Sequence, residues 1–453
     1  MAGSTHSTHP TRRLVAALTA GATLAFGLTA CSSGSSNPAD TLVVAEWTNP
    51  AAITYTQTID AAFEKAHPGV TIQLQDAPTA ANAWPTLQAS LLASKNVDVL
   101  AQFAQNPASY PPASLGTKPS GTPALIAAGQ FVNLAKQSYM QRFDTATQQY
   151  TMGYNGGIYG VTVAEYVNNT GLFYKKSLLD KYNLPVPTTF DQLINDFKVL
   201  KQNGITPLYV AGKDGYQSIV WFGIVNQLLM EGKPASAAAS VYLQRAEAFL
   251  NGSQTWDSPL YQEAVQRYEE VMAYMEPSAG GVSAQTAPGE WAVNANNDAF
   301  FVDGSYDGNT IAQDNPNLSF GFFALPGTDS ASANRAALAP DLSWTIPTFS
   351  KHQTLAEEWI DFFTEPANYA GWLKATGSSS TEPAVPTPSL SWTGWLSANS
   401  ANGFVNASQP WYPNGAPSDA DGPVLTAMQP FGSQSPSAAL SQAASAYKSS
   451  IGH

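Results

Sequence analysis

Histidine and cysteine, which most often perform nucleophilic and metal chemistry in proteins, are scarce in this sequence. The 453 residues contain five histidines and one cysteine. Beyond the first 30 residues the histidines are His67, His352 and His453, which lie far apart in sequence. No metal-ligand spacing, P-loop or dinucleotide fingerprint fits the sequence, and residues 304–308 (GSYDG) place their serine one position too early for a G-x-S-x-G nucleophile elbow. We therefore expect no catalytic site, no metal and no cofactor.

Carboxylates are plentiful, because Asp and Glu together number 33. A glycoside hydrolase needs only two of them, one on each side of the scissile bond. The sequence does not show which acids lie at that separation. A secreted glycoside hydrolase therefore stays open as an alternative function.

Aromatic rings and carboxylates are also the side chains that bind a neutral sugar without changing it. The C–H faces of a sugar ring stack on flat rings, while its hydroxyls need donors and acceptors. An unpaired buried polar group costs about 1–3 kcal/mol, so each hydroxyl needs a placed partner. Trp47, Thr48 and Asn49 follow an expected strand, and Glu165 and Tyr166 lie between two strand-like segments. We expect these five residues to bind ligand.

The charge balance is strongly acidic, with a formal net charge of −13. This argues against nucleic acid or an anionic surface as a partner. A cationic solute such as a polyamine fits the sign, although long-range charge sets encounter rates more than the chemistry of a site. A polyamine-binding protein and an adhesion or scaffold lipoprotein therefore remain further alternatives.

The N-terminus predicts export. Arg12-Arg13 precedes an apolar run from Leu14 to Ala30, which is typical of a signal peptide and short for a membrane anchor helix. Both the general secretory and the twin-arginine route stay open. Residues 28–31 (LTAC) resemble the bacterial lipobox, which implies cleavage before Cys31 and a diacylglycerol on its thiol. Cys31 is the only cysteine, so disulfides are excluded. Residues 31–40 predict a flexible tether.

Hydrophobic periodicity predicts alternating strands and helices. Strands are expected at 41–46, 70–74 and 97–103, and Ile59, Ala62, Phe63 and Ala66 form one helix face between the first two. The sequence also predicts a helix from Thr188 or Thr189 to Gln202, a helix around 264–275, a strand at 320–325, a helix ending before Pro366 and a last helix at 437–447. Strand and helix alternation points to an α/β fold.

The order of these segments resembles the extracellular solute-binding proteins of carbohydrate ABC importers, the family that includes the maltose-binding protein. Lys175 and Tyr306 stand where the family usually has Asn and Trp. The segments that carry the resemblance are 62–70 (AFEKAHPGV), 97–99 (VDV), 157–161 (GIYGV), 170–176 (TGLFYKK), 187–193 (PTTFDQL), 203–208 (NGITPL), 301–306 (FVDGSY) and 321–327 (GFFALPG).

The resemblance implies a two-lobed α/β fold of the periplasmic-binding type, with a hinge and a central ligand cleft. One lobe is expected from 41–164 plus about 345–380, and the other from about 171–340 plus about 395–453. The chain is expected to cross between them at Glu165–Thr170, at Leu338–Trp344 and after Gly377.

The resemblance also implies the function: capture of a mono- or oligosaccharide for import by the permease subunits of an ABC transporter, at the outer face of the membrane. Segments that contact ligand in the family place Trp221, Tyr306 and Trp344 in the site. The remaining polar residues assigned to the site are Gln102, Asp303 and Asp341.

Overall fold

The computed structural model describes residues 40–79, 82–104, 121–166, 170–294, 297–405, 428 and 430–451. The expected signal peptide and Cys31 lie outside the described residues, so the lipid anchor stays a prediction. No helix within these ranges is long and apolar enough to cross a membrane.

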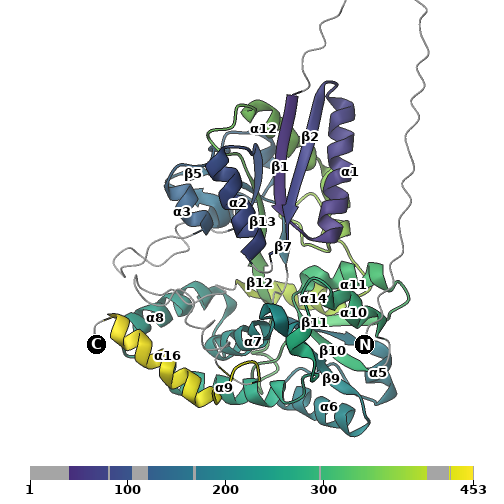
Figure 1. Cartoon of the computed structure of the whole chain (residues 1–453), viewed down its shortest axis with the longest axis vertical. Helices are drawn as coiled ribbons and strands as arrows, with labels where there is room; N and C mark the ends of the chain where they lie inside the picture. Colours follow the sequence, from purple (N-terminus) through teal and green to yellow (C-terminus); the bar gives the residue numbers. More distant parts are fainter. Residues whose placement is uncertain are drawn as a thin grey trace, which may run out of the picture. The chain divides into compact units, whose positions relative to one another are not determined.

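The first sheet has five strands in the order β2-β1-β3-β13-β6. Strands β1, β2 and β3 are parallel, while β13 is antiparallel to both β3 and β6. The three strands expected at 41–46, 70–74 and 97–103 are confirmed as β1, β2 and β3. Figure 1 shows α1 lying along β1 and β2. The elements around this sheet are β1 (Asp40–Trp47), α1 (Pro50–Ala66), β2 (Val70–Ala77), α2 (Ala83–Ser94), β3 (Val99–Phe103), α3 (Gly121–Ala127), α4 (Thr145–Met152), β4 (Gly153–Tyr154), β5 (Gly157–Ile158), β6 (Val161–Thr162), β13 (Leu342–Thr345), α12 (Gln353–Phe363) and α13 (Pro366–Thr376).

Helix α1 shows why these segments fold as they do. Asn49 caps it, because its Oδ1 accepts two backbone N–H groups of the first turn at 3.1 and 3.2 Å. Those groups have no partner inside the helix. The predicted face is confirmed only in part: Ile59 and Phe63 are buried in the core of this sheet, whereas Ala62 and Ala66 are exposed.

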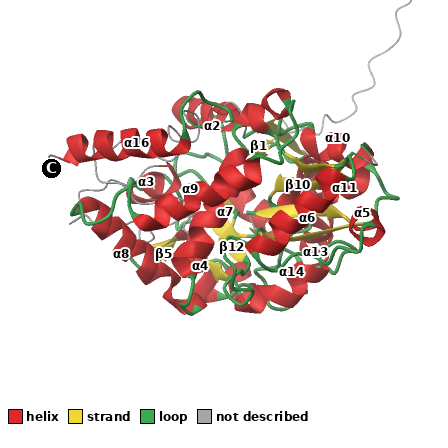
Figure 2. Cartoon of the chain, turned by 90° about the horizontal axis from the view of Figure 1, so that it is seen from below, coloured by secondary structure: helices red, strands yellow, loops and turns green. Residues whose placement is uncertain are grey.

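The second sheet has four strands in the order β11-β8-β10-β9, and only β8 runs against the others. Figure 2 shows helices such as α6 and α7 lying over its strands. The elements around this sheet are β8 (Gly171–Lys175), α5 (Lys176–Lys181), α6 (Phe190–Gln202), β9 (Thr206–Tyr209), α7 (Gln217–Met230), α8 (Ala238–Leu250), α9 (Pro259–Met272), α10 (Ala287–Val293), β10 (Asp298–Asp303), α11 (Gly308–Asp314), β11 (Phe320–Ala324), α14 (Gly394–Asn399), β14 (Phe404–Val405) and α16 (Pro436–Ile451).

Both faces of the second sheet are covered. Along β10, Phe300 and Val302 belong to one core cluster and Phe301 to another, because successive side chains leave a strand on opposite faces. Every residue of β10 is therefore buried. The first sheet has its own core, drawn from 42–164 and 342–385.

Three stretches of chain connect the two sheets. The first contains β7 (Glu165–Tyr166) and the second β12 (Ala337–Pro340), which pair antiparallel. The third follows Gly377, which ends α13 with a φ of 73° that favours glycine. Ser379, on this third stretch, forms a β-bridge with Glu165. Residues of all three stretches thus lie side by side.

An unexpected acid lies beneath α1. Glu46 on β1 is fully buried, and neither of its carboxyl oxygens has a hydrogen-bond partner of normal geometry among the described residues. Burial raises the pKa of Glu46 from 4.5 to about 8, with smaller contributions from Asp60 and Asp76. Burial likewise raises the pKa of Asp60 to about 7, although Trp359 Nε1 donates a 2.8 Å hydrogen bond to it. Glu46 is therefore held in its neutral form.

Glu46→Gln should make the folded protein more stable at neutral pH. The folded protein keeps a proton on Glu46 that the unfolded chain releases above pH 4.5, so native stability falls as the pH rises from 4.5 to about 8. The slope approaches about 1.4 kcal/mol per pH unit while this group titrates. Thermal unfolding measured across this range should show a Tm difference between variant and native protein that widens with pH. Glu269→Gln, which removes an exposed acid of α9, is the control. A Tm difference that does not change with pH would contradict the assignment.

Candidate functional site

The strand directions define where a site can form. In the first sheet, the carboxyl ends of β1, β2, β3 and β6 and the amino end of β13 share one edge. In the second, the carboxyl ends of β9, β10 and β11 meet the amino end of β8. Ligands of open α/β sheets bind at carboxyl ends of strands. The connecting stretches leave or enter both sheets at these edges.

An aromatic platform ends β1 and β3. The rings of Trp47 and Phe103 are stacked, with centroids 4.5 Å apart and planes 20° apart. Trp84 meets Trp47 edge-on at 5.9 Å. Phe103 is 40% exposed, whereas Trp47 is 8% exposed. The predicted Trp47 therefore supports a ring that presents its face to solvent. Phe103 is absent from the prediction because it reads as the last residue of a strand.

The polar neighbours of Trp47 have structural roles. Asn49 uses its side-chain oxygen to cap α1. Thr48 donates a short side-chain hydrogen bond to Asp76, and its backbone N–H donates to Ala77 at 2.9 Å. These bonds fix the loop that carries the aromatic platform.

Gln102, the residue before Phe103, is 1% exposed. Its Oε1 accepts a 3.0 Å hydrogen bond from Thr122, while its Nε2 is buried without a partner among the described residues. Such a donor carries a desolvation cost unless something accepts from it. The predicted Gln102 thus lies near the carboxyl end of β3, and its Nε2 amide group has no acceptor among the described residues.

Two half-buried carboxyls lie on the connecting stretches. Glu165 begins β7, and Asp341 directly follows β12. The backbone of Asp341 is fixed from both sides, since its N–H donates to Ala164 and its carbonyl accepts from Ala104. Burial raises the pKa of Asp341 to about 7 and raises the pKa of Glu165. The side chain of the neighbouring Tyr166 lies outside the described residues.

The edge of the second sheet carries an acid–tyrosine cluster. Asp303 ends β10 opposite Gly171, the first residue of β8 after the first connection. Its Oδ1 accepts the N–H of Gly304 at 2.7 Å, its Oδ2 is buried without a partner of normal geometry among the described residues, and Tyr306 and Asp307 lie beside it. Burial, and then the charge of Asp307, raises the pKa of Asp303. Burial also raises the pKa of Asp307 to about 6.

Tyr216 extends this cluster, because burial and then the nearby carboxyls of Asp303 and Asp307 raise the pKa of its hydroxyl. It lies just before α7, close after the carboxyl end of β9. Asp214, two residues earlier, accepts from the Ser283 hydroxyl at 2.9 Å and from the Ala284 N–H at 2.8 Å. Asp303 and Tyr306 are predicted from the sequence as ligand-binding residues. Tyr216 is not, because no periodic pattern or motif marks it.

Trp221 and Trp344 are corrections, because the structure places both in cores. Trp221 is fully buried in α7 and packs on Tyr261 and Tyr268. Trp344 is fully buried on β13 and meets Trp359 edge-on at 5.0 Å. Their assignment to the site came from the family resemblance, and the apolar residues Ile224, Val225 and Leu228, at helical spacing from Trp221, are equally typical of a core position.

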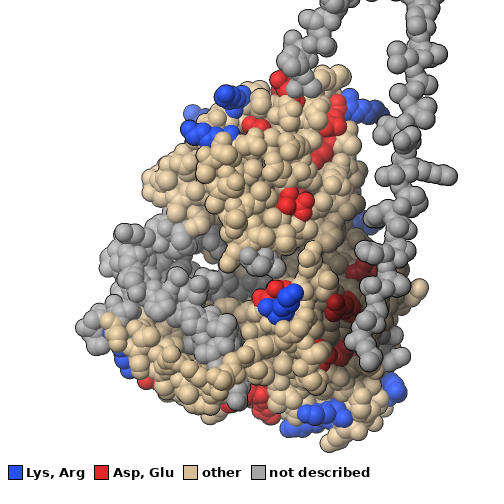
Figure 3. Space-filling model, in the orientation of Figure 1, with Lys and Arg blue, Asp and Glu red and all other residues tan. Residues whose placement is uncertain are grey.

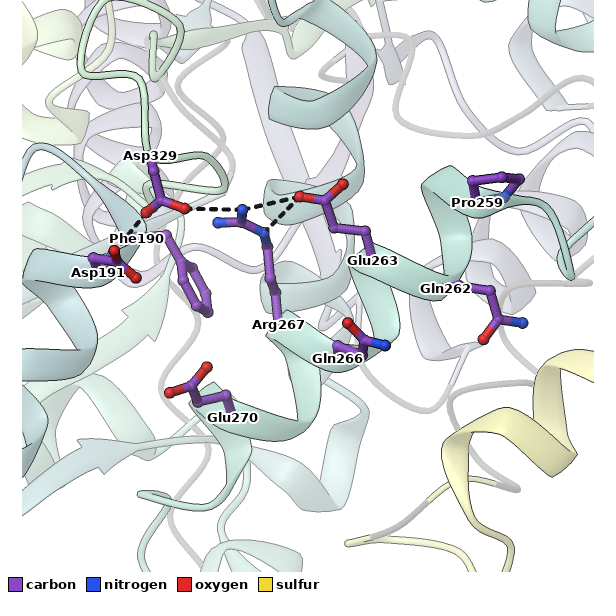
Figure 4. A pocket seen from close by; sticks show the side chains of 9 residues that line it. All are labelled: Phe190, Asp191, Pro259, Gln262, Glu263, Gln266, Arg267, Glu270 and Asp329. Atoms are coloured by element: carbon purple, nitrogen blue, oxygen red, sulfur yellow. Dashed lines mark hydrogen bonds and ion pairs between the residues drawn. The ribbon is translucent and has the colours of Figure 1, made fainter.

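A surface pocket of about 520 Å³ lies elsewhere, between α6, α9 and the loop after β11. Figure 4 shows Arg267 at its centre, bound to Glu263 at 2.9 Å and to Asp329 at 3.0 Å. Its guanidinium lies over the Phe190 ring at 4.7 Å, and Asp329 also accepts the N–H of Asp191 at the start of α6. These polar groups hold the loop against two helices. None of the predicted site residues lines this pocket.

The described residues hold no group of three or more His, Cys, Asp or Glu placed for a metal ion. Ser350, His352 and Asp98 do lie together, but both Ser350 Oγ, at 2.6 Å, and His352 Nδ1, at 3.3 Å, contact the Asp98 carboxyl. The Ser350 oxygen accepts from the His352 backbone N–H. This arrangement fixes the loop before α12 and does not pair a nucleophile with a base.

Comparisons with known proteins agree with this geometry. The multiple sugar-binding protein of Streptococcus mutans is 21% identical over 336 residues, covering 70% of this chain and 69% of that protein. The melibiose/raffinose/stachyose-binding protein MelE of Bacillus subtilis is 23% identical over 253 residues, covering 54% and 55%. The solved structure of the solute-binding protein RafE in complex with raffinose has a TM-score of 0.70 at 17% identity, covering 91% of this chain and 99% of that one.

The predicted two-lobed α/β fold is confirmed by this structural similarity. Residues 48–370 match the family described as bacterial extracellular solute-binding protein. Since that match spans well over half of the sequence, the chain belongs to the bacterial extracellular solute-binding proteins.

Proposed function

We propose that this chain is the binding protein of an ABC importer and captures a mono- or oligosaccharide without changing it chemically. The family supplies the binding role, and the names of two relatives include multiple sugars, melibiose, raffinose and stachyose. The ligand lies at the strand edges of the two sheets, beside the connecting stretches. Permease subunits in the membrane then receive it.

The aromatic platform is the observation that carries the proposal. Phe103 is 40% exposed, and its ring stacks on Trp47, which supports it from one side. The C–H face of a pyranose gains dispersion contact with such a ring. The exposed part of Phe103 would otherwise be apolar surface in water at a functional edge.

The surrounding acids select for ligands that donate hydrogen bonds. Among the described residues, no Lys or Arg forms an ion pair with Glu165, Asp303, Asp307 or Asp341. Sugar hydroxyls satisfy such carboxyls, whereas the carboxylate of an acidic sugar would be repelled. In Figure 3, charged side chains on the visible face are scattered among wide uncharged areas. A neutral sugar therefore fits the site best.

A ligand panel tests the proposal. Thermal unfolding is followed with raffinose, stachyose, maltose, glucuronate and spermidine. A neutral sugar at a hundredfold excess over its Kd should stabilise the protein by about 2.7 kcal/mol, and glucuronate should not. Chromatography should recover the sugar intact. Stabilisation by spermidine alone would favour a cationic solute, and release of shorter sugars would favour the glycoside hydrolase.

Glu165→Ala should weaken binding of the stabilising sugar by roughly tenfold or more. A hydrogen bond to a charged group contributes about 1.5–3 kcal/mol, and about 1.4 kcal/mol corresponds to one decade in Kd. Calorimetry measures the Kd, and the Tm without ligand should change little because Glu165 is half-buried. Glu269→Ala on α9 is the control for removal of one acid. Unchanged affinity in Glu165→Ala would exclude that carboxyl from the site.

We also propose that Cys31 carries a lipid that anchors the protein at the outer face of the membrane. The support is its solitary position after residues 28–30 and the expected tether that follows. Cys31→Ala should abolish the lipid and release the protein from the membrane fraction. Mass spectrometry of the N-terminal peptide is the measurement. An unmodified Cys31, or an uncleaved leader, would contradict this anchor.

A further inference from the structure

A buried network of side-chain hydrogen bonds surrounds Thr162, the last residue of β6 and three residues before Glu165. Gln148 of α4 binds the backbone of Thr162 from both sides: its Oε1 accepts the N–H at 2.8 Å, and its Nε2 donates to the carbonyl at 2.9 Å. Gln148 and Thr162 are fully buried. The start of the first connecting stretch is therefore fixed to α4 through a side chain.

The Thr162 side chain extends the network to the second stretch. Its Oγ1 lies 2.8 Å from Ser343 Oγ on β13 and 2.6 Å from Thr151 Oγ1 on α4. Thr151 donates its own hydrogen to the carbonyl of Thr147 at 2.9 Å. The order of donation is then set: Ser343 donates to Thr162, and Thr162 donates to Thr151.

Tyr369 of α13 joins the third stretch to the first. Its hydroxyl donates to the carbonyl of Val163 at 2.6 Å and accepts the N–H of Thr381 at 3.0 Å. The Thr381 hydroxyl donates to the carbonyl of Thr162 at 2.7 Å. Tyr369 is fully buried, and Thr381 is 6% exposed. The Tyr369 hydroxyl of α13 therefore links the first connecting stretch to the third. The Thr381 hydroxyl links the third stretch to Thr162, where the first stretch begins.

Strand β7 is too short to set its register alone. It has only two residues: Glu165 pairs with Pro340, which has no N–H to donate, and Tyr166 pairs with Ala339. A shift of one residue would turn every side chain of a strand to the other face. The Ser379 N–H donates to the Glu165 carbonyl at 2.8 Å, but that bond holds register only if Ser379 is itself fixed. Thr381, two residues later, is fixed by Tyr369 and Thr162.

We propose that Tyr369 is a positioning residue for ligand binding: its hydroxyl holds the first and third connecting stretches in register and thereby aims the Glu165 carboxyl at the ligand. Fully satisfied buried networks of this kind rigidify one arrangement, while a broken one leaves costly unpaired groups. The role of Glu165 in this inference rests on the proposed function. The role of Tyr369 in holding the register of the connecting stretches does not, so the register can be tested separately from ligand binding.

The test compares Tyr369→Phe with Tyr268→Phe. Tyr268 is an equally buried tyrosine of α9, but its hydroxyl has no partner of normal geometry among the described residues. Raffinose, or the neutral sugar that stabilises the native protein most, is the calorimetric probe. Tyr369→Phe should raise the Kd about tenfold or more, and Tyr268→Phe should leave it unchanged. Thr381→Val removes the hydroxyl that contacts Thr162 and Tyr369 but keeps the Tyr369 hydroxyl, so it keeps the test open if Tyr369→Phe does not fold.

Two further readouts separate positioning from mere stability. If Tyr369 acts through Glu165, the double variant Tyr369→Phe with Glu165→Ala should bind no more weakly than Glu165→Ala alone. Hydrogen exchange of the Ser379 amide should accelerate at least tenfold in Tyr369→Phe. A lower Tm with unchanged Kd would overturn the proposal, as would fully additive losses in the double variant. If the native protein binds no sugar of the panel, the proposed function fails, and unchanged exchange at Ser379 then overturns the register role independently.

Discussion

Three stretches of chain connect the two sheets, and buried side-chain hydrogen bonds around Thr162 join them. The carbonyl of Thr162 accepts from Gln148 and from Thr381, and its hydroxyl contacts Ser343. Apolar side chains would bury the same surface but would permit sliding, because hydrophobic burial has no direction. Hydrogen bonds have narrow geometry, so they define one register for strands too short to define it themselves. The edge at which ligand is proposed to bind depends on that register.

Acids without cationic partners recur through the molecule. The sequence has 33 acids against 20 Lys and Arg, so many carboxyls cannot find a cation. Where such acids are withdrawn from water, fully at Glu46 and partly at Asp341, burial raises their pKa to about 8 and about 7, and they keep a proton near neutral pH. A protonated carboxyl donates as well as accepts. At Asp341 this property suits a sugar hydroxyl, which needs partners of both kinds.

Local patterns predict most of the elements around the two sheets. The cap of α6 at Thr189 is confirmed, and so are Ile59 and Phe63 of the α1 stripe, because periodicity and capping involve residues within a few positions of one another. The same local pattern also predicts that the first strand ends next to Trp47, which is the last residue of β1. Trp221 and Trp344 show the limit, since a tryptophan is equally suited to a core and to a binding surface. Only packing distinguishes the two, and both rings are fully buried.

The network around Thr162 was beyond sequence reasoning for a different reason. Thr381 lies 219 residues from Thr162, and Tyr369 lies 206 residues from Val163. Serine, threonine and tyrosine at such separations carry no periodic signal, and each alone is an ordinary surface or loop residue. Their role appears only when the fold brings three connections together. Phe103 was missed similarly, because its exposure depends on where the chain turns after β3.

The two sheet edges offer unlike chemistry, and this difference bears on how a ligand would act. The first edge carries the aromatic face of Phe103, and the second carries Asp303, Tyr306 and Tyr216. A ligand that contacted only one edge would bind equally well however the lobes were arranged, so it would shift no conformational equilibrium. A sugar has both an apolar face and a rim of hydroxyls, so it can use both edges at once. Any differential affinity for a closed form would then depend on Glu165 and Asp341, which lie on the stretches that connect the two sheets. Any loss of register there would reduce the contacts that a closed form adds, and would leave contacts with a single lobe intact.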